Sequence, residues 1–375
     1  MVTDNRMPNL RIGDLVASIP IIQGGMGVGI SLSGLASAVA NAGGIGVISG
    51  LGLGVVEMDV RDNYREANKR ALRREIRKAR ETTSGAIGVN IMVVATGFED
   101  LIQGAVDELA DLVLLGAGLP LKLPETLPLD RLGSLHTKFV PIVSSGRAAK
   151  LIFRSWEKRY NHVPDAVVVE GPLAGGHLGF SKEQISHPDY MLERILPDVI
   201  SELTPFEARF DKTIPVIAAG GIYTGADINR ILQLGAHGVQ MGTRFVATHE
   251  CDASIKFKEA FVKCREEDIV IIDSPVGLPG RAIRNTFLDE VSAGIRKPFK
   301  CPWTCLRTCA VESAPYCIAN ALTNAKRGNL EKGFVFAGAN AYRVDKIVSV
   351  KELIETLMEE YEGAASGQKL LQLPG

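Results

Sequence analysis

Long apolar runs are missing from this 375-residue sequence, and so is an excess of charge of either sign. No stretch reaches the roughly 18 apolar residues that a membrane-spanning helix requires. The 42 Lys and Arg residues nearly balance the 43 Asp and Glu residues, whereas nucleic-acid-binding proteins usually carry a basic excess. The N-terminal segment 1–11 has no apolar core, so it does not form a secretory signal. We therefore expect a cytoplasmic protein that binds neither nucleic acid nor membrane.

Aromatic residues are also scarce at 6%, whereas glycine is abundant with 39 residues. The 46% of hydrophobic residues is enough to build a core and excludes a disordered chain. Many glycines with few aromatics are typical of an α/β enzyme that has tight turns and ligand loops lined by backbone.

Eight short apolar runs alternate with helical patterns through the first two thirds of the chain. Most are apolar without interruption, which is the pattern of strands buried on both faces of a parallel sheet. The expected strands are Ile19–Ile22, Ile45–Ser49, Ala86–Ile91, Leu112–Leu115, Phe139–Val143, Ala166–Val169, Ile214–Ala218 and Gly238–Met241.

Helical patterns lie between these strands, at Ser31–Ala42, Asp62–Thr82, Phe98–Leu109, Arg147–Tyr160, Ala226–Leu234 and Ala253–Glu266. Ser31 has the side chain of an N-cap, and glycines follow Ala42. Eight βα units in about 240 residues predict a TIM barrel, with an open doubly wound sheet as the alternative. We assign residues 1–266 to the barrel and 267–375 to an irregular C-terminal elaboration that packs on it. This elaboration ends in a helix from Val350 to about Tyr361.

Glycines stand where three of the expected strands end, and in a barrel the loops after the strands build the active site. Gly24 and Gly25 follow the first strand, Gly220 and Gly221 the seventh, and Gly242 the eighth. Loops after strands 7 and 8 often bind phosphate through backbone N–H groups, so we expect a phosphate site there. Plain tight turns are the alternative.

His177 lies in a glycine-rich loop after the sixth expected strand, within the segment Glu170–Gly179. A histidine at the catalytic end of a barrel can act as a general base near neutral pH. The alternative is a histidine that hydrogen-bonds its own loop.

Four of the six cysteines, Cys301, Cys305, Cys309 and Cys317, fall within 17 consecutive positions. If residues 302–309 form a helix, the first three lie on one face. Four thiolates can bind a [4Fe–4S] cluster or a structural zinc ion, and the absence of paired Cys knuckles favours iron–sulfur. Free buried thiols remain a third possibility.

Several segments together resemble the nitronate monooxygenase (2-nitropropane dioxygenase) family of FMN-dependent TIM-barrel enzymes, which also contains enoyl-acyl-carrier-protein reductases. They are Gln23–Met26, Gly88–Asn90, Glu170–His177, Ala219–Ile222 and Gln240–Phe245. The resemblance implies that His177 transfers a proton. It implies a cofactor site made of Gly24, Gly25, Met26, Asn90, Glu170, Gly175, Gly176, Gly220, Gly221, Gln240, Gly242 and Thr243.

The C-terminal third resembles one branch of this family, the fused flavin and iron–sulfur fatty-acyl-carrier-protein dehydrogenase/isomerase of unsaturated fatty acid synthesis. The matching segments are Glu170–Leu173, Ser274–Gly277, Arg281–Ile283, Tyr316–Ala319 and Gly338–Asp345. This branch dehydrogenates a saturated ten-carbon acyl thioester and moves the double bond. The gap before Cys317 is shorter here than in the branch. The resemblance implies FMN, a [4Fe–4S] cluster and an acyl-thioester substrate.

Other functions remain open at this stage. They are oxidation of alkyl nitronates, enoyl-acyl-carrier-protein reduction, and a barrel without catalysis that binds a flavin or another phosphorylated ligand. The segment Asp62–Thr82 carries eight basic residues; it is either a solvated face or a docking site for an acidic acyl carrier protein. The sequence is compatible with a homodimer and does not determine the oligomeric state.

Overall fold

The computed structural model describes residues 6–57, 59–60, 62–301 and 303–372. Its central sheet has eight parallel strands, one at each expected position. They are β3 (Ile21–Gln23), β4 (Gly46–Ser49), β5 (Ile87–Met92), β6 (Leu112–Gly116), β7 (Lys138–Val143), β8 (Val167–Glu170), β10 (Val216–Ala219) and β11 (Gly238–Met241). Because nearly all of their side chains are buried, the continuous apolar runs are explained.

The sheet closes on itself. Its order is β3-β11-β10-β8-β7-β6-β5-β4, and Ile45 joins the two ends. The Ile45 N–H donates to Ile21 O at 3.0 Å, and Ile45 O accepts from the Gln23 N–H at 2.9 Å. The predicted TIM barrel is therefore confirmed, and the open sheet is excluded. Buried side chains of the strands fill its interior, among them Ile22, Val47, Leu114, Val168 and Ile217.

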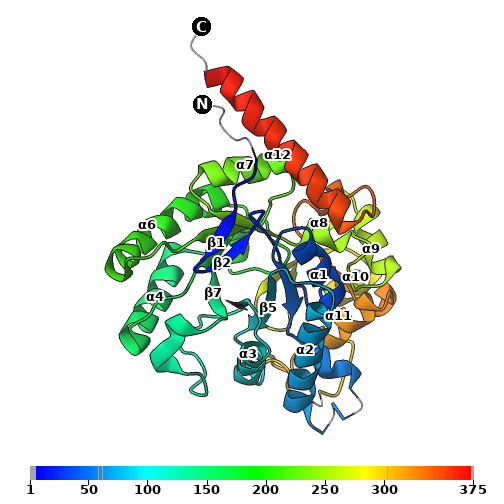
Figure 1. Ribbon diagram of the computed structural model, residues 1–375. Helices are drawn as coiled ribbons and strands as arrows, with labels where there is room; N and C mark the ends of the chain where they lie inside the picture. The colour runs from blue at the N-terminus through cyan, green and yellow to red at the C-terminus, as the bar shows by residue number, and fades with distance from the viewer. Residues whose placement is uncertain (1–5, 58, 61, 302, 373–375) are drawn as a thin grey trace.

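Helices surround the barrel (Figure 1). The longer ones are α1 (Ser33–Asn41), α2 (Tyr64–Arg80), α3 (Phe98–Asp107), α4 (Gly146–Tyr160), α6 (Leu192–Phe210), α7 (Gly225–Gln233), α9 (Ile255–Val262), α11 (Ile318–Lys326) and α12 (Val350–Gln372). The shorter ones are α5 (Lys182–Ile185), α8 (Thr243–Val246) and α10 (Thr286–Ser292). Within the described residues no helix combines the length and apolar character needed to cross a bilayer.

The start of α1 differs from its prediction. Ser31 does not cap the helix; its hydroxyl accepts the Met26 N–H at 2.9 Å. Instead Asp252 accepts the N–H groups of Leu32 and Leu35 at 2.7 and 3.2 Å. A carboxylate from a distant loop thus stabilises the free donors of the helix N-terminus. Ser31 meanwhile holds the turn after the first barrel strand.

Additional strands lie at both ends of the barrel. At its N-terminal end, the hairpin of β1 (Leu10–Ile12) and β2 (Leu15–Ala17) places Leu10 and Ile12 against the barrel interior (Figure 1). At the other end, β12 (Ile269–Asp273), β13 (Pro279–Ile283) and β14 (Val335–Phe336) form a sheet with β9 (Gly176–His177). A strand from a barrel loop therefore shares a sheet with C-terminal strands.

The last helix, α12, packs along α7 and projects from the barrel (Figure 1). It was predicted to end near Tyr361, but it continues to Gln372. The extension contains Gly363 and Gly367. Because glycine lowers helix propensity, the sequence suggested that the helix ends before them.

Candidate active site

The predicted cofactor-binding residues gather at the C-terminal end of the barrel. Gly24 lies next to Gln240, since a Cβ atom on Gly24 would be 3.5 Å from Gln240 Cγ. Gly25 packs closely against Asn90, and Gly242 faces the Met26 side chain, whose Sδ would be 3.6 Å from a Cβ atom on Gly242. The structure therefore brings together the turn after β3, Asn90 of β5, Gln240 of β11 and Gly242 directly after β11.

Gln240 gives a test of whether a flavin ring fits here. Its side-chain Oε1 is buried and accepts no hydrogen bond from any part of the chain that the structure describes. A buried acceptor without a donor is unfavourable by about 1–3 kcal/mol. A flavin ring offers an N–H group that could satisfy it, so the site fits the predicted cofactor.

The loop after β10 has two glycines in the left-handed region of backbone conformation. Gly220 and Gly221 have φ values of +92° and +82°, a region that L side chains rarely adopt. A Cβ atom would lie 2.8 Å from Gly171 O at position 220 and 2.9 Å from Leu173 Cδ1 at position 221. The two positions therefore require glycine, because the loop backbone packs closely against residues 171–174.

A C-terminal segment, 338–340, crosses these loops. The Gly338 N–H donates to Thr243 Oγ1 at 3.2 Å, and Asn340 Nδ2 donates to Gly221 O at 2.7 Å. Gly175 also serves this contact, since a Cβ atom there would be 2.6 Å from Gly338 N. Residues far apart in sequence thus complete the predicted phosphate site.

Tyr223 and two arginines beside the same loops were not predicted. The guanidinium carbons of Arg244 and Arg343 lie 4.5 and 4.3 Å from the Tyr223 ring centroid. The Tyr223 hydroxyl is buried without a partner among the described residues. Two cations stacked on one ring put positive charge near the place where a phosphate is expected. The position of Arg244, directly after Gly242-Thr243, is the sequence signal that could have indicated positive charge at this site.

His177 lies on β9 at the same end of the barrel. Its Nε2 is 2.7 Å from Ser274 Oγ, and its ring packs edge-on against Phe336 with centroids 4.9 Å apart. Burial lowers the pKa of His177 to about 4. The ring is therefore neutral at pH 7 and can accept a proton.

Glu170, at the end of β8, is a second titratable group in this site. It keeps some accessible surface, but protein encloses the rest of it, and this burial raises its pKa to about 7. Near neutral pH about half of the carboxyl groups are therefore protonated and can donate a hydrogen bond. Oppositely shifted groups at one site are typical of active sites.

Arg281 supports the loop that carries His177. Its side chain is buried, and its Nη1 donates to both Pro172 O and Ala174 O at 2.6 Å. Burial lowers its pKa to about 10, so it remains charged at neutral pH. A guanidinium that binds two loop carbonyls fixes the backbone between Glu170 and His177.

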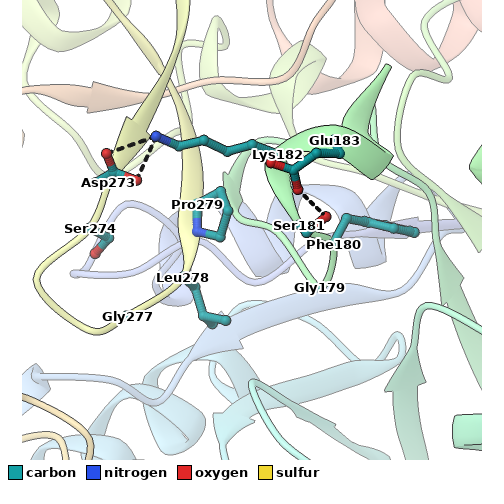
Figure 2. A pocket seen from close by; sticks show the side chains of 10 residues that line it. All are labelled: Gly179, Phe180, Ser181, Lys182, Glu183, Asp273, Ser274, Gly277, Leu278 and Pro279. Atoms are coloured by element: carbon teal, nitrogen blue, oxygen red, sulfur yellow. Dashed lines mark hydrogen bonds and ion pairs between the residues drawn. The ribbon is translucent and has the colours of Figure 1, made fainter. Parts of the chain in front are cut away.

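A cavity of about 640 Å³ is lined in part by Ser274, the hydrogen-bond partner of His177. Figure 2 shows the residues that line it. Its walls are the segment 179–183 and the β12–β13 hairpin, with the apolar side chains Phe180, Leu278 and Pro279. Lys182 and Asp273 form an ion pair at 2.8 Å across the wall (Figure 2). Both are well exposed, so the pair contributes little to stability.

The cysteine segment is not the helix that would place three of the cysteines on one face. Residues 303–309 are irregular, and Thr304 has a φ of +46°; residue 302 lies outside the described part. The segment pairs with the loop after β5 instead. The Thr96 N–H donates to Cys305 O at 3.1 Å, and the Arg307 N–H donates to Val94 O at 2.9 Å.

Cys305 is the buried centre of the four cysteines. Burial and the neighbouring thiols of Cys317, Cys301 and Cys309 raise its pKa to about 12. The four side chains are therefore close enough to interact electrostatically. Yet within the described ranges no three His, Cys, Asp or Glu side chains are arranged to hold a metal ion.

The basic helix α2 is largely neutralised by its neighbours. Six of its arginines form ion pairs with acidic residues before α2 or around α3 and β6. The pairs are Arg65–Asp100, Arg70–Asp59, Arg73–Asp107, Arg74–Glu57, Arg77–Glu108 and Arg80–Asp111. This favours the solvated face over a docking site.

The shift at His177 leads to a prediction for pH dependence. A histidine whose pKa is lowered loses its proton-accepting form only as the pH falls through that lower value. We expect the rate of flavin reduction by substrate to hold between about pH 7 and 5 and to fall toward pH 4. Stopped-flow absorbance under anaerobic conditions measures this rate. A rate that stays constant from about pH 5 to about pH 3 would contradict the lowered pKa of His177. Any change between about pH 6 and 8 belongs to Glu170, whose pKa is raised to about 7.

Comparison with known proteins places these features in context. A family model described as nitronate monooxygenase matches residues 10–115 and 106–360. A Staphylococcus saprophyticus protein described as a probable nitronate monooxygenase is 26% identical, with 93% of this chain and 96% of the relative covered. The structure of FabK from Thermotoga maritima is 30% identical with a TM-score of 0.71, covering 94% of this chain and 95% of that one. A nitroalkane oxidase from Streptomyces ansochromogenes, 22% identical with a TM-score of 0.70 over 94% and 98% of the two chains, shares the fold.

Proposed function

Because this chain belongs to the nitronate monooxygenase family, we propose that it is an FMN-dependent oxidoreductase that removes a proton from its substrate with His177. The observation that carries the proposal is a partly buried imidazole with a lowered pKa, at the barrel end where the glycine loops and Gln240 fit a flavin. When bound, FMN would accept a hydride equivalent, the two electrons and the second hydrogen that the substrate loses besides that proton.

The chain's own residues have separable tasks in this reaction. His177 accepts a proton from a carbon made acidic by a neighbouring activating group. Ser274 holds the imidazole through the 2.7 Å hydrogen bond to Nε2. Arg281 fixes the loop through Pro172 O and Ala174 O. The segment 338–340 covers the loops and excludes water from the predicted phosphate site.

A fatty acyl thioester is the substrate class that we propose. Both a thioester and a nitro group acidify the neighbouring carbon, so proton transfer to His177 is compatible with either class of substrate. The cavity beside Ser274 supports the larger substrate, because about 640 Å³ lined by Phe180, Leu278 and Pro279 exceeds the needs of a small nitronate. The motifs shared with the acyl-carrier-protein dehydrogenase/isomerase branch favour the same choice. Acyl carrier protein would then be the partner that delivers the chain.

Anaerobic mixing separates the rivals. The FMN-loaded protein is mixed with a ten-carbon saturated acyl thioester or with an alkyl nitronate, and flavin absorbance is followed. Bleaching by the thioester supports a dehydrogenase, and bleaching by the nitronate alone supports a nitronate monooxygenase. An enoyl-acyl-carrier-protein reductase would instead oxidise a flavin already reduced by nicotinamide cofactor when an enoyl thioester is added. Protein purified without flavin, and unable to bind it, would contradict the proposal as a whole.

Ser274 provides a prediction about positioning. Ser274→Ala removes a hydrogen bond that is typically worth about 0.5–1.5 kcal/mol, so flavin reduction should slow about 2- to 10-fold. Ser274→Thr keeps the hydroxyl and should restore most of the rate. Equal rates for all three proteins, measured at saturating substrate, would show that the hydrogen bond does not orient His177.

A [4Fe–4S] cluster on Cys301, Cys305, Cys309 and Cys317 is the second cofactor that we propose. The mutual approach of the four thiols around Cys305 supports it, whereas their arrangement does not yet form a metal site. No step of the reaction above depends on it.

Metal analysis tests this second cofactor. Protein purified without oxygen should contain about four iron atoms per chain, and Cys305→Ser should lose most of them. Cys264→Ser is the matched control, because Cys264 is another buried thiol outside the group. Zinc in place of iron would indicate a structural site, and the absence of both metals would contradict the proposal.

A further inference from the structure

A second large cavity, of about 1380 Å³, lies at the N-terminal end of the barrel, opposite His177. It lies between the β1–β2 hairpin and the residues that precede or begin β7, β8, β10 and β11. We call it the basal cavity. We propose that the basal cavity binds the phosphate group of a small phosphorylated molecule, at a site separate from the predicted flavin site.

Buried cations carry this inference. Lys138 and Lys212 line the basal cavity with side chains only 10% and 28% exposed. Lys212 Nζ lies 3.2 Å from Val163 O, whereas its nearest carboxylate, Asp165, is 3.6 Å away. The half-buried Lys212 ammonium group therefore has only a loosely paired carboxylate and would gain from a closer anion, while the buried Lys138 is paired with Asp14.

The acidic residues of the basal cavity do not balance its cations. Three side chains with a permanent positive charge line it, Arg11, Lys138 and Lys212, against the two carboxylates of Asp14 and Asp165. Asp165 also accepts the Phe139 N–H at 2.9 Å. Asp14 contacts Lys138 at 2.6 Å but is 81% exposed on the hairpin turn. A stronger anion can therefore take the place of Asp14 on Lys138, because water can solvate the exposed Asp14 carboxylate once it is released.

Three imidazoles offer further polar groups. His162, His237 and His136 also line the basal cavity. Burial lowers the pKa of His162, and the charges of Lys212 and Lys138 lower it further, while Asp165 acts in the opposite direction. Burial and Lys138 likewise lower the pKa of Lys212, against Asp165. These cationic groups therefore disfavour one another's charge, and an added anion would relieve that repulsion.

A phosphate group suits this arrangement. Ammonium and imidazole N–H groups are good donors to phosphate oxygens, and a doubly charged anion gains most from several cations. The volume of the basal cavity greatly exceeds that of a phosphate ion, so we expect the phosphate to be carried on an organic group such as a nucleoside. The site lies at the end of the barrel away from the proposed chemistry, so the inference does not depend on the proposed function.

Calorimetric titration of the FMN-loaded protein tests the proposal, because bound FMN keeps its own phosphate site filled. ADP and inorganic phosphate are titrated separately into the wild type, Lys212→Met and Lys150→Met. Lys150 pairs with Glu202 at 2.6 Å on the surface of α4 and serves as the matched control. We expect one saturable site per chain, weakened about 10- to 100-fold in Lys212→Met and unchanged in Lys150→Met. Tighter binding of ADP than of phosphate would show that the organic group contributes.

Two outcomes would overturn the proposal. One is the absence of saturable binding of either probe up to about 10 mM. The other is equal weakening in both variants, which would mean a diffuse surface effect. If Lys212→Met does not fold, Lys138→Met and the charge-preserving Lys212→Arg take its place. Binding retained in Lys212→Arg and lost in Lys138→Met supports the site, and binding unaffected by Lys138→Met contradicts it.

Discussion

Replacement of His177 by alanine should slow flavin reduction by substrate about 10²- to 10⁴-fold, while FMN stays bound. The loss follows from the absence of another neutral imidazole near the site: within the described residues, His177 is the only histidine that contacts Ser274 on the β12–β13 hairpin. FMN should remain, because the ring lies on β9 and not on the glycine loops after β10 and β11. Anaerobic stopped-flow absorbance gives the rate, and the visible spectrum gives the FMN content.

His187→Ala is the matched control, because His187 is an exposed histidine in the segment between α5 and α6. Its rate should equal that of the wild type. Since the His177 ring also packs on Phe336, His177→Asn is measured in parallel to separate lost packing from lost proton transfer. A decrease of less than about threefold in both His177 variants would make His177 a structural loop residue, given the usual size of acid–base contributions.

Replacement of Gly221 by leucine should give colourless protein. The φ of +82° disfavours any L side chain, and the new Cβ would lie 2.9 Å from Leu173 Cδ1. Leu173 and Gly221 O both bind the segment 338–340, through Ala339 and Asn340. The substitution therefore disturbs both the loop and its cover. We expect FMN affinity to fall by at least about 100-fold, which corresponds to roughly 3 kcal/mol.

Gly235→Leu separates this effect from general backbone strain. Gly235 has a φ of +99°, and a Cβ atom there would meet Ile200 Cδ1 at 3.0 Å. It lies between α7 and β11, at the N-terminal end of the barrel. The Gly235→Leu variant should have a lowered melting temperature, like Gly221→Leu, but should keep its yellow colour. Full FMN content in Gly221→Leu would place the phosphate elsewhere.

The barrel itself could be predicted from local patterns. Each of its eight strands is an apolar run, because strands buried on both faces need apolar side chains at every position. Six helices begin within a few residues of their expected positions. Helix α6 was missed. It contains Pro197 and Pro205, which usually interrupt helices, so its tertiary packing outweighs a local signal against it.

In the cysteine segment, by contrast, the local pattern fits a helix that does not form. The spacing of Cys301, Cys305 and Cys309 fits a helix, but the backbone hydrogen bonds to Val94 and Thr96 hold the segment irregular. Such pairing with a loop about 200 residues away leaves no trace in local periodicity. The same limit applies to the sheet that joins β9 to β13.

The candidate site was predictable where one loop carries the signal, and not where distant loops meet. The glycines after β10 and β11 and His177 were identified from their positions at strand ends. Ser274 was not assigned a role, since it is 97 positions from His177 in sequence. The stacking of Arg244 and Arg343 on Tyr223 likewise depends on contacts that only the folded chain creates.

The crossing of segment 338–340 over the glycine loops has a consequence for biogenesis. A ribosome translating this chain completes the eight barrel strands long before it reaches Gly338 and Asn340. The nascent barrel can close while the cover of its predicted phosphate site is still missing. Stable flavin loading should therefore wait until the segment 338–340 has been synthesised and has closed over the loops.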